Sequence, residues 1–281
     1  MSLAPMLEVR PGPVVVLSPH LDDAVLSMGA AMAHASRGGE SVRVVTVFAN
    51  DPASRAPAGA WDAACGFTTQ GAAARARREE DRRACAALGV EPVWLPFADG
   101  EHDSSADDAD VEAAVLEHLR DAGSVFVPGA PLAQPDHAWL TELVVSSPAI
   151  RIPTGFYVEQ PYAALTVMSR GGRLGSEGLT ARRGALNAMR IAARCGREIQ
   201  EPGRARVPGG RSAGAVEWCR LAATARDRRA KRRAIAAYAS QLCGFGPLVR
   251  TRMALHERGW GGEGGAWCVI DRAPGPERQA T

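Results

Sequence analysis

One stretch near the N-terminus, residues 13–39, constrains the fold of this chain more than any other. It opens with an apolar, valine-rich run at residues 14–17, which predicts a buried strand. A polar turn with His20, Asp22 and Asp23 follows, and apolar residues then recur at helical spacing until Gly38. In open α/β sheets, ligands bind where such strands end. We therefore expect a functional site in this turn.

The residue types in the turn suit a metal ion. Imidazole and carboxylate groups are ligands for zinc and similar divalent ions. Two adjacent carboxylates in an apolar setting repel each other, so one takes up a proton unless a cation lies nearby. One of Asp22 and Asp23 could then bind metal while the other serves as a base. The alternative is that both are capping residues of the helix with no chemical role.

Residues 18–27, SPHLDDAVLS, resemble the first motif of the PIG-L/LmbE-like de-N-acetylases, and the form here is similar to that of deacetylases from glycopeptide-antibiotic pathways. Leu21 stands where proline is commoner. This family of zinc hydrolases removes acetyl groups from N-acetylglucosamine-type amino sugars. The resemblance implies that His20 and Asp23 bind zinc, or another divalent metal, and that Asp22 is the general base.

A second motif, PLAQPDH at residues 131–137, also follows a predicted strand, at residues 124–127. It is similar to the His-Pro-Asp-His motif of the family, which makes His137 the third metal ligand. Asp136 is expected to orient the nearby imidazole of this Asp-His pair. Gln134 replaces a histidine that assists catalysis in the family. An amide can donate a hydrogen bond to an oxyanion but cannot exchange a proton. Either another group is therefore the acid, for which Asp22 is a candidate once it has taken up a proton, or the enzyme is slow, or it acts on a different substrate.

Three further residues are predicted to contact substrate by the same resemblance. Arg77, with Glu80, precedes the end of the helix predicted at residues 72–88, and Glu159 and Tyr162 follow the strand predicted at residues 152–158. For Arg77 the alternative is a place on a solvated helix face. For Glu159 and Tyr162 it is a packing role at the end of a strand.

The remaining elements predict an α/β fold. Strands are expected at residues 41–48, 92–97 and 267–270, and helices at 111–119, 137–145 and 220–241, with a long loop at 50–71. Strand, helix and strand within the first 48 residues indicate a parallel sheet. We expect a single Rossmann-like three-layer sandwich over residues 1–281, with a mostly parallel central sheet. Its parts would be a core with the metal site (12–163), a variable excursion (164–230) and a C-terminal helix and strand (231–281).

The composition limits the classes of partner that the protein is expected to bind. The formal charge of +2 gives no general attraction to nucleic acid. The six cysteines form no CxxC pair, which argues against a cysteine-zinc site and favours a reduced set. No signal peptide or apolar run of spanning length is evident. We expect a cytoplasmic protein that acts on a small molecule, with no nucleic-acid or membrane partner.

The resemblance thus implies a metal-dependent N-deacetylase that acts on an N-acetylated amino sugar, such as a glycosylated secondary metabolite or an aminoglycoside-type intermediate. Two alternatives stay open. Two histidines and one carboxylate also form the iron site of oxygenases. Gln134 could instead mark a catalytically weakened homologue that only binds a sugar.

Overall fold

The computed structural model describes residues 11–98, 107–130, 132, 134–164, 206–207, 211–212, 217–242, 249, 251, 253 and 263–268. Five strands form the first part of the sheet: β1 (Val14–Ser18), β2 (Val42–Thr46), β3 (Glu91–Trp94), β4 (Ser124–Ala130) and β5 (Thr154–Val158). The later strands are β6 (Arg206–Val207), β7 (Arg211–Ser212), β8 (Glu217–Arg220) and β9 (Gly264–Cys268). The helices are α1 (Asp23–Arg37), α2 (Ala60–Ala64), α3 (Gln70–Leu88), α4 (Asp108–Leu119), α5 (Pro135–Ser146), α8 (Ala225–Ala236) and α9 (Ala239–Leu242).

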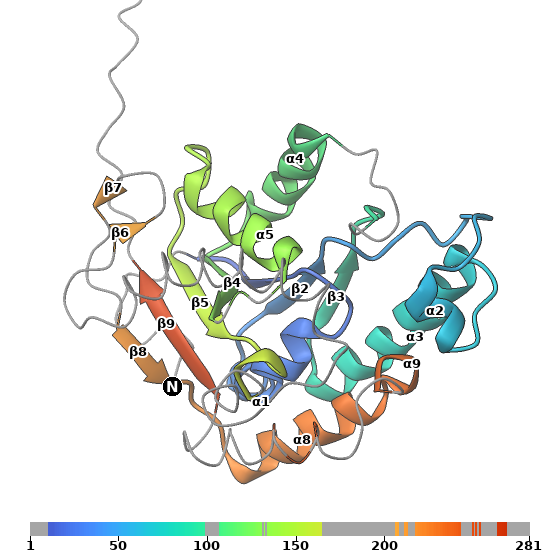
Figure 1. Ribbon diagram of the computed structural model, residues 1–281. Helices are drawn as coiled ribbons and strands as arrows, with labels where there is room; N and C mark the ends of the chain where they lie inside the picture. The colour runs from blue at the N-terminus through green and yellow to red at the C-terminus, as the bar shows by residue number, and fades with distance from the viewer. Residues whose placement is uncertain are drawn as a thin grey trace, which may run out of the picture.

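The central sheet has seven strands in the order β3-β2-β1-β4-β5-β9-β8. The first five run parallel, and β9 and β8 join them in antiparallel pairs. Helices α1, α3 and α8 cover one face and α4 and α5 cover the other (Figure 1). The prediction of a three-layer sandwich with a mostly parallel sheet is confirmed.

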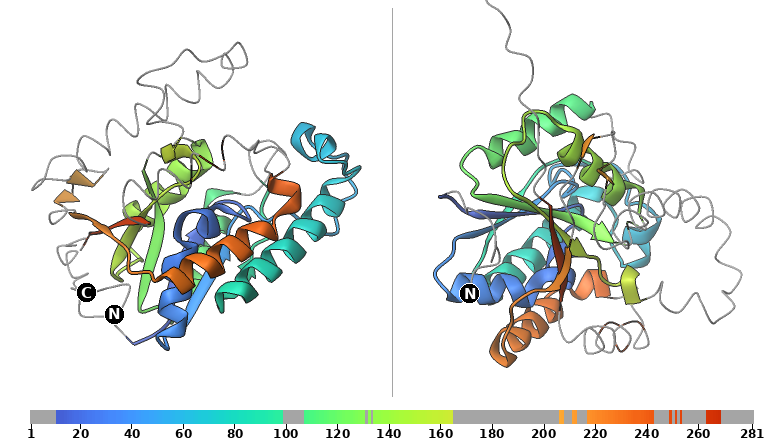
Figure 2. Two further views of the ribbon diagram at one scale, coloured as in Figure 1. Left: turned by 90° about the horizontal axis from the view of Figure 1, so that it is seen from below. Right: turned by 90° about the vertical axis from the view of Figure 1, so that its left-hand side faces the viewer.

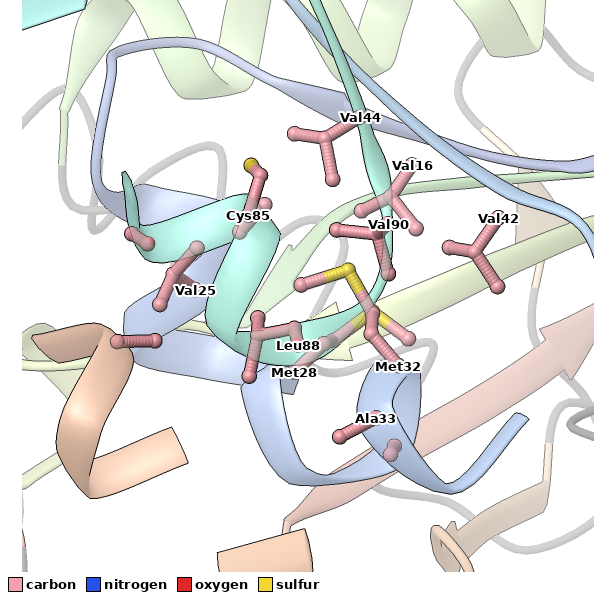
Figure 3. Close-up of a cluster of buried hydrophobic side chains, with 14 of the residues drawn as sticks. Val16, Val25, Met28, Met32, Ala33, Val42, Val44, Cys85, Leu88 and Val90 are labelled. Carbon is pink, nitrogen blue, oxygen red and sulfur yellow. The ribbon is translucent and has the colours of Figure 1, made fainter. Parts of the chain in front are cut away.

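The alternation of side chains along β1 shows why this strand is central. Val16 packs with Met28 and Met32 of α1 on one face of the sheet (Figure 3), and Val14 belongs to the same cluster. The side chains between them, Val15 and Leu17, pack on the other face with α5. Because successive side chains of a strand point to opposite faces, the apolar run at residues 14–17 places β1 between two helical layers.

The strand order reverses at β1, which pairs with β2 on one side and β4 on the other. A crevice between the loops that follow two such strands is the usual ligand site of open α/β sheets. Here the turn after β1 begins at Pro19, and the connection from β4 to α5 contains Leu132 and Gln134. The topology therefore brings two segments that lie more than a hundred residues apart to one edge.

Several predicted boundaries shift. The loop predicted at residues 50–71 contains the short helix α2, and α3 begins at Gln70, where Thr69 accepts a hydrogen bond from the backbone of Ala72. The single helix predicted at residues 220–241 is wrong at its start, because residues 217–220 form β8 against β9 and α8 begins only at Ala225. A capping box between Thr224 and Asp227 sets that start. Within the described residues, no helix combines the length and apolar character needed to cross a membrane.

Candidate metal centre

The turn after β1 is held in shape by the hydroxyl of Ser18. This hydroxyl donates to the carbonyl oxygen of His20 at 2.6 Å and accepts from the backbone N–H of Ala24 at 3.0 Å. The backbone N–H of His20 donates to Oδ2 of Asp23 at 2.9 Å. Asp22 occupies the N-cap position of α1, yet its side chain makes no capping hydrogen bond. The Asp22 carboxylate is therefore not used as a helix cap.

The second segment presents His137 from the first turn of α5. Its side chain has no exposed surface, and Nδ1 forms a short hydrogen bond with Oε1 of Glu159, at the end of β5. The other carboxylate oxygen of Glu159 accepts from the backbone N–H of Leu132 at 2.5 Å. Leu132 has a φ of +52°, in the left-handed region that non-glycine residues seldom adopt. Glu159 thus links the end of β5 to Leu132, in the connection between β4 and α5, and to His137, in the first turn of α5.

Three predicted ligands converge at this edge. Nε2 of His137 lies 3.1 Å from Oδ2 of Asp23 and 3.3 Å from Nδ1 of His20, and the last two atoms are 3.2 Å apart. They form the one cluster of metal-binding side chains found among the described residues. Two ligands at about 2.0–2.1 Å from a tetrahedral zinc ion lie ~3.3–3.4 Å apart. The separations therefore fit a single divalent ion.

Electrostatics in the cluster also favour a cation. Although burial opposes a charged imidazole, hydrogen bonds to Asp136 and Asp23 raise the pKa of His20 to about 9. Burial also opposes charge on His137, but Asp23 and Glu159 raise its pKa well above the usual value. The carboxylates thus hold positive charge on the two imidazoles. A divalent ion at the same place would supply that charge.

Asp22 lies beside this cluster without belonging to it. Burial, together with the neighbouring Asp23 carboxylate, raises the pKa of Asp22 to about 7. The positive charges of His20 and Arg77 act in the opposite direction. Asp23 thus belongs to the cluster of candidate ligands, whereas Asp22 lies outside it.

Asp136 and Gln134 lie at the start of α5. Oδ2 of Asp136 is 3.3 Å from Nε2 of His20, so the imidazole that Asp136 contacts is His20, whereas the carboxylate partner of His137 is Glu159. Nε2 of Gln134 donates to the hydroxyl oxygen of Tyr162 at 2.7 Å. The ring of Tyr162 meets the ring of His137 edge-on, with 5.5 Å between centroids. Gln134 and Tyr162 thus form one polar pair next to His137.

Arg77 projects from α3 and is 8% exposed. Its guanidinium forms an ion pair with the buried carboxylate of Asp62, on α2. The solvated helix face considered for Arg77 is therefore wrong. Sequence reasoning missed Asp62 because a single aspartate in a long loop carries no motif; its one signal was the length of that loop, which is typical of segments near a site.

Comparisons with known proteins agree with this geometry. Residues 15–147 match the family model described as PIG-L: GlcNAc-PI de-N-acetylase. No curated protein matches the chain. Among solved structures, the A40926 pseudoaglycone deacetylase Dbv21 is 24% identical, with a TM-score of 0.67 over 94% of this chain and 100% of its own.

Two other structures are similar. The zinc-inhibited form of teicoplanin deacetylase Orf2 is 21% identical, with a TM-score of 0.67 over 93% of this chain and 100% of its own. The N,N'-diacetylchitobiose deacetylase from Pyrococcus horikoshii is 18% identical, with a TM-score of 0.51 over 95% of this chain and 88% of its own. At these identities the structures establish a shared fold. The family match covers residues 15–147, slightly under half of the chain, and includes both motifs.

Proposed function

We propose that the protein hydrolyses the acetamido group of an N-acetylated amino sugar, using a divalent metal ion, zinc foremost, held by His20, Asp23 and His137. The observation that carries this proposal is the convergence of three ligand atoms from two distant segments within 4.8 Å of one another. A zinc ion in such a site activates a water molecule at neutral pH and polarises a carbonyl oxygen. The donor set of two imidazoles and one carboxylate suits that ion.

Side chains of the protein carry out proton transfer, orientation of the ligands and contact with the substrate oxygen. Asp22, beside the ligands but outside the cluster, accepts the proton of the attacking water and returns it to the leaving nitrogen. Glu159 and Asp136 hold the imidazoles of His137 and His20 in orientation. An amide nitrogen carries two protons, so Gln134 can donate to the substrate oxygen while it donates to Tyr162.

We further propose that the substrate is a glycosylated secondary metabolite or an aminoglycoside-type intermediate. Support comes from the printed descriptions of structural neighbours, which include a deacetylase–teicoplanin complex with a TM-score of 0.63 and 21% identity. The Gln134–Tyr162 pair is proposed to contact the sugar because it lies against His137 and carries hydrogen-bond donors. Arg77 is proposed as a further sugar contact by the resemblance to the family.

The test is release of free amine from N-acetylated glycosides, including N-acetylglucosaminyl pseudoaglycones of glycopeptide antibiotics. The purified protein should show activity that a chelator abolishes and that one equivalent of Zn²⁺ restores. A His137→Ala variant should lose both activity and bound metal, whereas His118→Ala, which changes a partly exposed residue of α4, should keep both. Absence of amine release from every member of the panel by a metal-loaded wild-type protein would refute the proposal.

A further inference from the structure

The turn that follows β5 places a phenol beside the proposed ligand His137. Nε2 of Gln134 donates to the hydroxyl oxygen of Tyr162 at 2.7 Å. The ring of Tyr162 meets the imidazole of His137 at an interplanar angle of 88°, with 5.5 Å between the ring centres. Tyr162 keeps part of its surface exposed, so a substrate bound at the metal centre can reach it. Two contacts therefore fix Tyr162 against the metal centre.

The turn after β5 is held by both helical layers. Glu159, which begins the turn, hydrogen-bonds Nδ1 of His137 in α5. The backbone N–H of Gln160 donates to the hydroxyl of Ser27 in α1 at 3.1 Å, and that of Ala163 donates to the carbonyl oxygen of Glu159 at 2.9 Å. The right-hand view of Figure 2 shows α5 and α1 on opposite faces of the sheet. A side chain on this turn therefore has the rigid support that a preorganised catalytic group needs.

The hydrogen bond from Gln134 directs the phenol proton of Tyr162 to another acceptor. A tyrosine hydroxyl has one proton to donate and can also accept hydrogen bonds. The amide of Gln134 uses an acceptor position of the Tyr162 oxygen, so the O–H bond points away from that amide. Accepting a hydrogen bond also polarises the hydroxyl and makes it a stronger donor. The pair thus presents the O–H of Tyr162 as an oriented donor beside His137.

Hydrolysis of an acetamido group needs a donor at this place. Negative charge develops on the former carbonyl oxygen in the tetrahedral intermediate, and fixed donors aimed at that oxygen stabilise it. The carboxylates of Asp22 and Asp136 also lie near the ligands, but an ionised carboxylate accepts hydrogen bonds and does not donate them. The phenol of Tyr162 is protonated at neutral pH and can donate. Its chemistry therefore suits the charged oxygen.

We propose that Tyr162 is a catalytic residue that donates a hydrogen bond to the acetamido oxygen of the substrate, and that Gln134 is the positioning residue for its hydroxyl. This inference rests on the proposed function and assigns a part of the reaction to the turn after β5. Tyr162 keeps its proton throughout, so its O–H bond is not broken. The proton that reaches the leaving nitrogen is the one that Asp22 takes from the attacking water.

The experiment compares two ligands that differ at the acyl group. One is p-nitrophenyl β-glucosaminide with a methylphosphonyl group on its nitrogen, whose tetrahedral, charged oxygens imitate the intermediate. The other is the same glycoside with a free amine. Calorimetry on zinc-loaded protein measures both dissociation constants. Tyr162→Phe should weaken binding of the phosphonamidate by roughly 10- to 100-fold, which is the size of a hydrogen bond to a charged group. Binding of the free amine should stay within twofold.

Kinetics and a second substitution test the reaction and the role of Gln134. Tyr162→Phe should lower kcat for amine release from the N-acetyl glycoside by roughly 10²- to 10³-fold, the usual cost of removing one such donor. In a Gln134→Met background, Tyr162→Phe should weaken phosphonamidate binding by less than threefold, because the hydroxyl has already lost its support. Tyr238→Phe, which removes a buried phenol hydroxyl paired with Asp81, is the matched control. It should leave the ratio of the two dissociation constants unchanged even where it lowers the melting temperature.

The outcomes distinguish the inference from the proposed function. Equal weakening of both ligands by Tyr162→Phe would place the hydroxyl on the sugar and overturn the inference, and so would unchanged binding of both. An equal penalty from Tyr162→Phe with and without Gln134 would also overturn it. In each of these cases the wild-type protein still deacetylates. A zinc-loaded wild-type protein that neither binds the phosphonamidate nor releases amine would instead overturn the proposed function, and the inference with it.

Discussion

The carboxylate of Glu159 hydrogen-bonds Nδ1 of His137 and leaves Nε2 of that imidazole facing Asp23 and His20. This contact decides which nitrogen of His137 is available for a metal ion. A carboxylate in this position also makes the imidazole a stronger ligand. Glu159 is 1% exposed, and its other oxygen accepts from the backbone of Leu132. It therefore positions both the ligand and the turn that precedes it.

Replacing Glu159 by Gln should weaken metal binding. An amide can still accept a hydrogen bond from Nδ1 but carries no charge, so we expect the dissociation constant for Zn²⁺ to rise by roughly 10- to 100-fold. Competition with a chromophoric chelator measures it. Glu142→Gln, at an exposed position of α5, is the matched control. Equal Zn²⁺ affinity of the two variants would contradict the role assigned to Glu159.

Replacing Asp22 by Asn should separate metal binding from chemistry. Because Asp22 is outside the ligand cluster, the variant should keep about one equivalent of bound metal. Its kcat should fall by roughly 10²- to 10⁴-fold, which is the usual contribution of a positioned acid or base. Elemental analysis and amine-release kinetics on the same sample check both statements. Loss of the metal together with activity would place Asp22 among the ligands instead.

The buried carboxyl of Asp81 should make stability depend on pH. Burial raises its pKa from 3.8 to about 6, although hydrogen bonds from Tyr238 and Trp94 oppose this shift. The folded state therefore binds this proton more tightly than the unfolded chain. The resulting stability is fully present below pH ~4 and is lost as the pH rises through about 6. Two pKa units correspond to about 3 kcal/mol.

Denaturant unfolding of the wild type and Asp81→Asn at pH 4.5 and pH 7.5 tests this dependence. The amide cannot titrate, so the stability advantage of the wild type over the variant should shrink as the pH rises. Glu117→Gln, at an exposed position of α4, controls for general effects of charge. An advantage that grows with pH would show that the pKa of Asp81 is lowered in the folded state.

A buried ion pair between Lys231 and Glu263 should matter for stability. Nζ of Lys231 lies 2.6 Å from Oε1 of Glu263, and the two residues are 3% and 4% exposed. The carboxylate also accepts from the backbone N–H groups of Ala30 and Ala31 in α1. The pair thus joins α8 to α1 through the residue before β9.

Glu263→Gln should destabilise the protein by about 3–5 kcal/mol, because it removes one charge of a buried pair and keeps the other. The double variant Lys231→Met/Glu263→Gln should be more stable than Glu263→Gln. Chemical denaturation of the single and double variants measures both differences. A loss below about 1 kcal/mol for the single variant would indicate that water reaches Lys231.

Much of the fold could be predicted from local patterns. The apolar runs of β1 and β2 and the helical spacing after Ala24 identified a parallel sheet, and the structure has these elements within a few residues of the predicted ranges. The prediction failed at Arg220, which ends the strand β8 and does not begin a helix, because a short strand at the side of the sheet has too little periodicity to be recognised from sequence. Its identity is set by pairing with β9, a contact between distant segments.

For the site too, local sequence determined one part and tertiary packing the other. Local sequence determined which residue types stand after β1 and at the start of α5, and the resemblance of these two motifs to a known family made His20, Asp23 and His137 candidates for one ion. Only the tertiary structure decided that Glu159 orients His137, that Asp136 contacts His20 and that Asp62 pairs with Arg77. The physical reason is that a ligand motif is a property of one turn, whereas the partner of each buried charge is chosen by how the strands and helices pack. The amino-acid sequence identifies the chemical groups available for a site, and the order of strands in the sheet determines which of these groups come into contact.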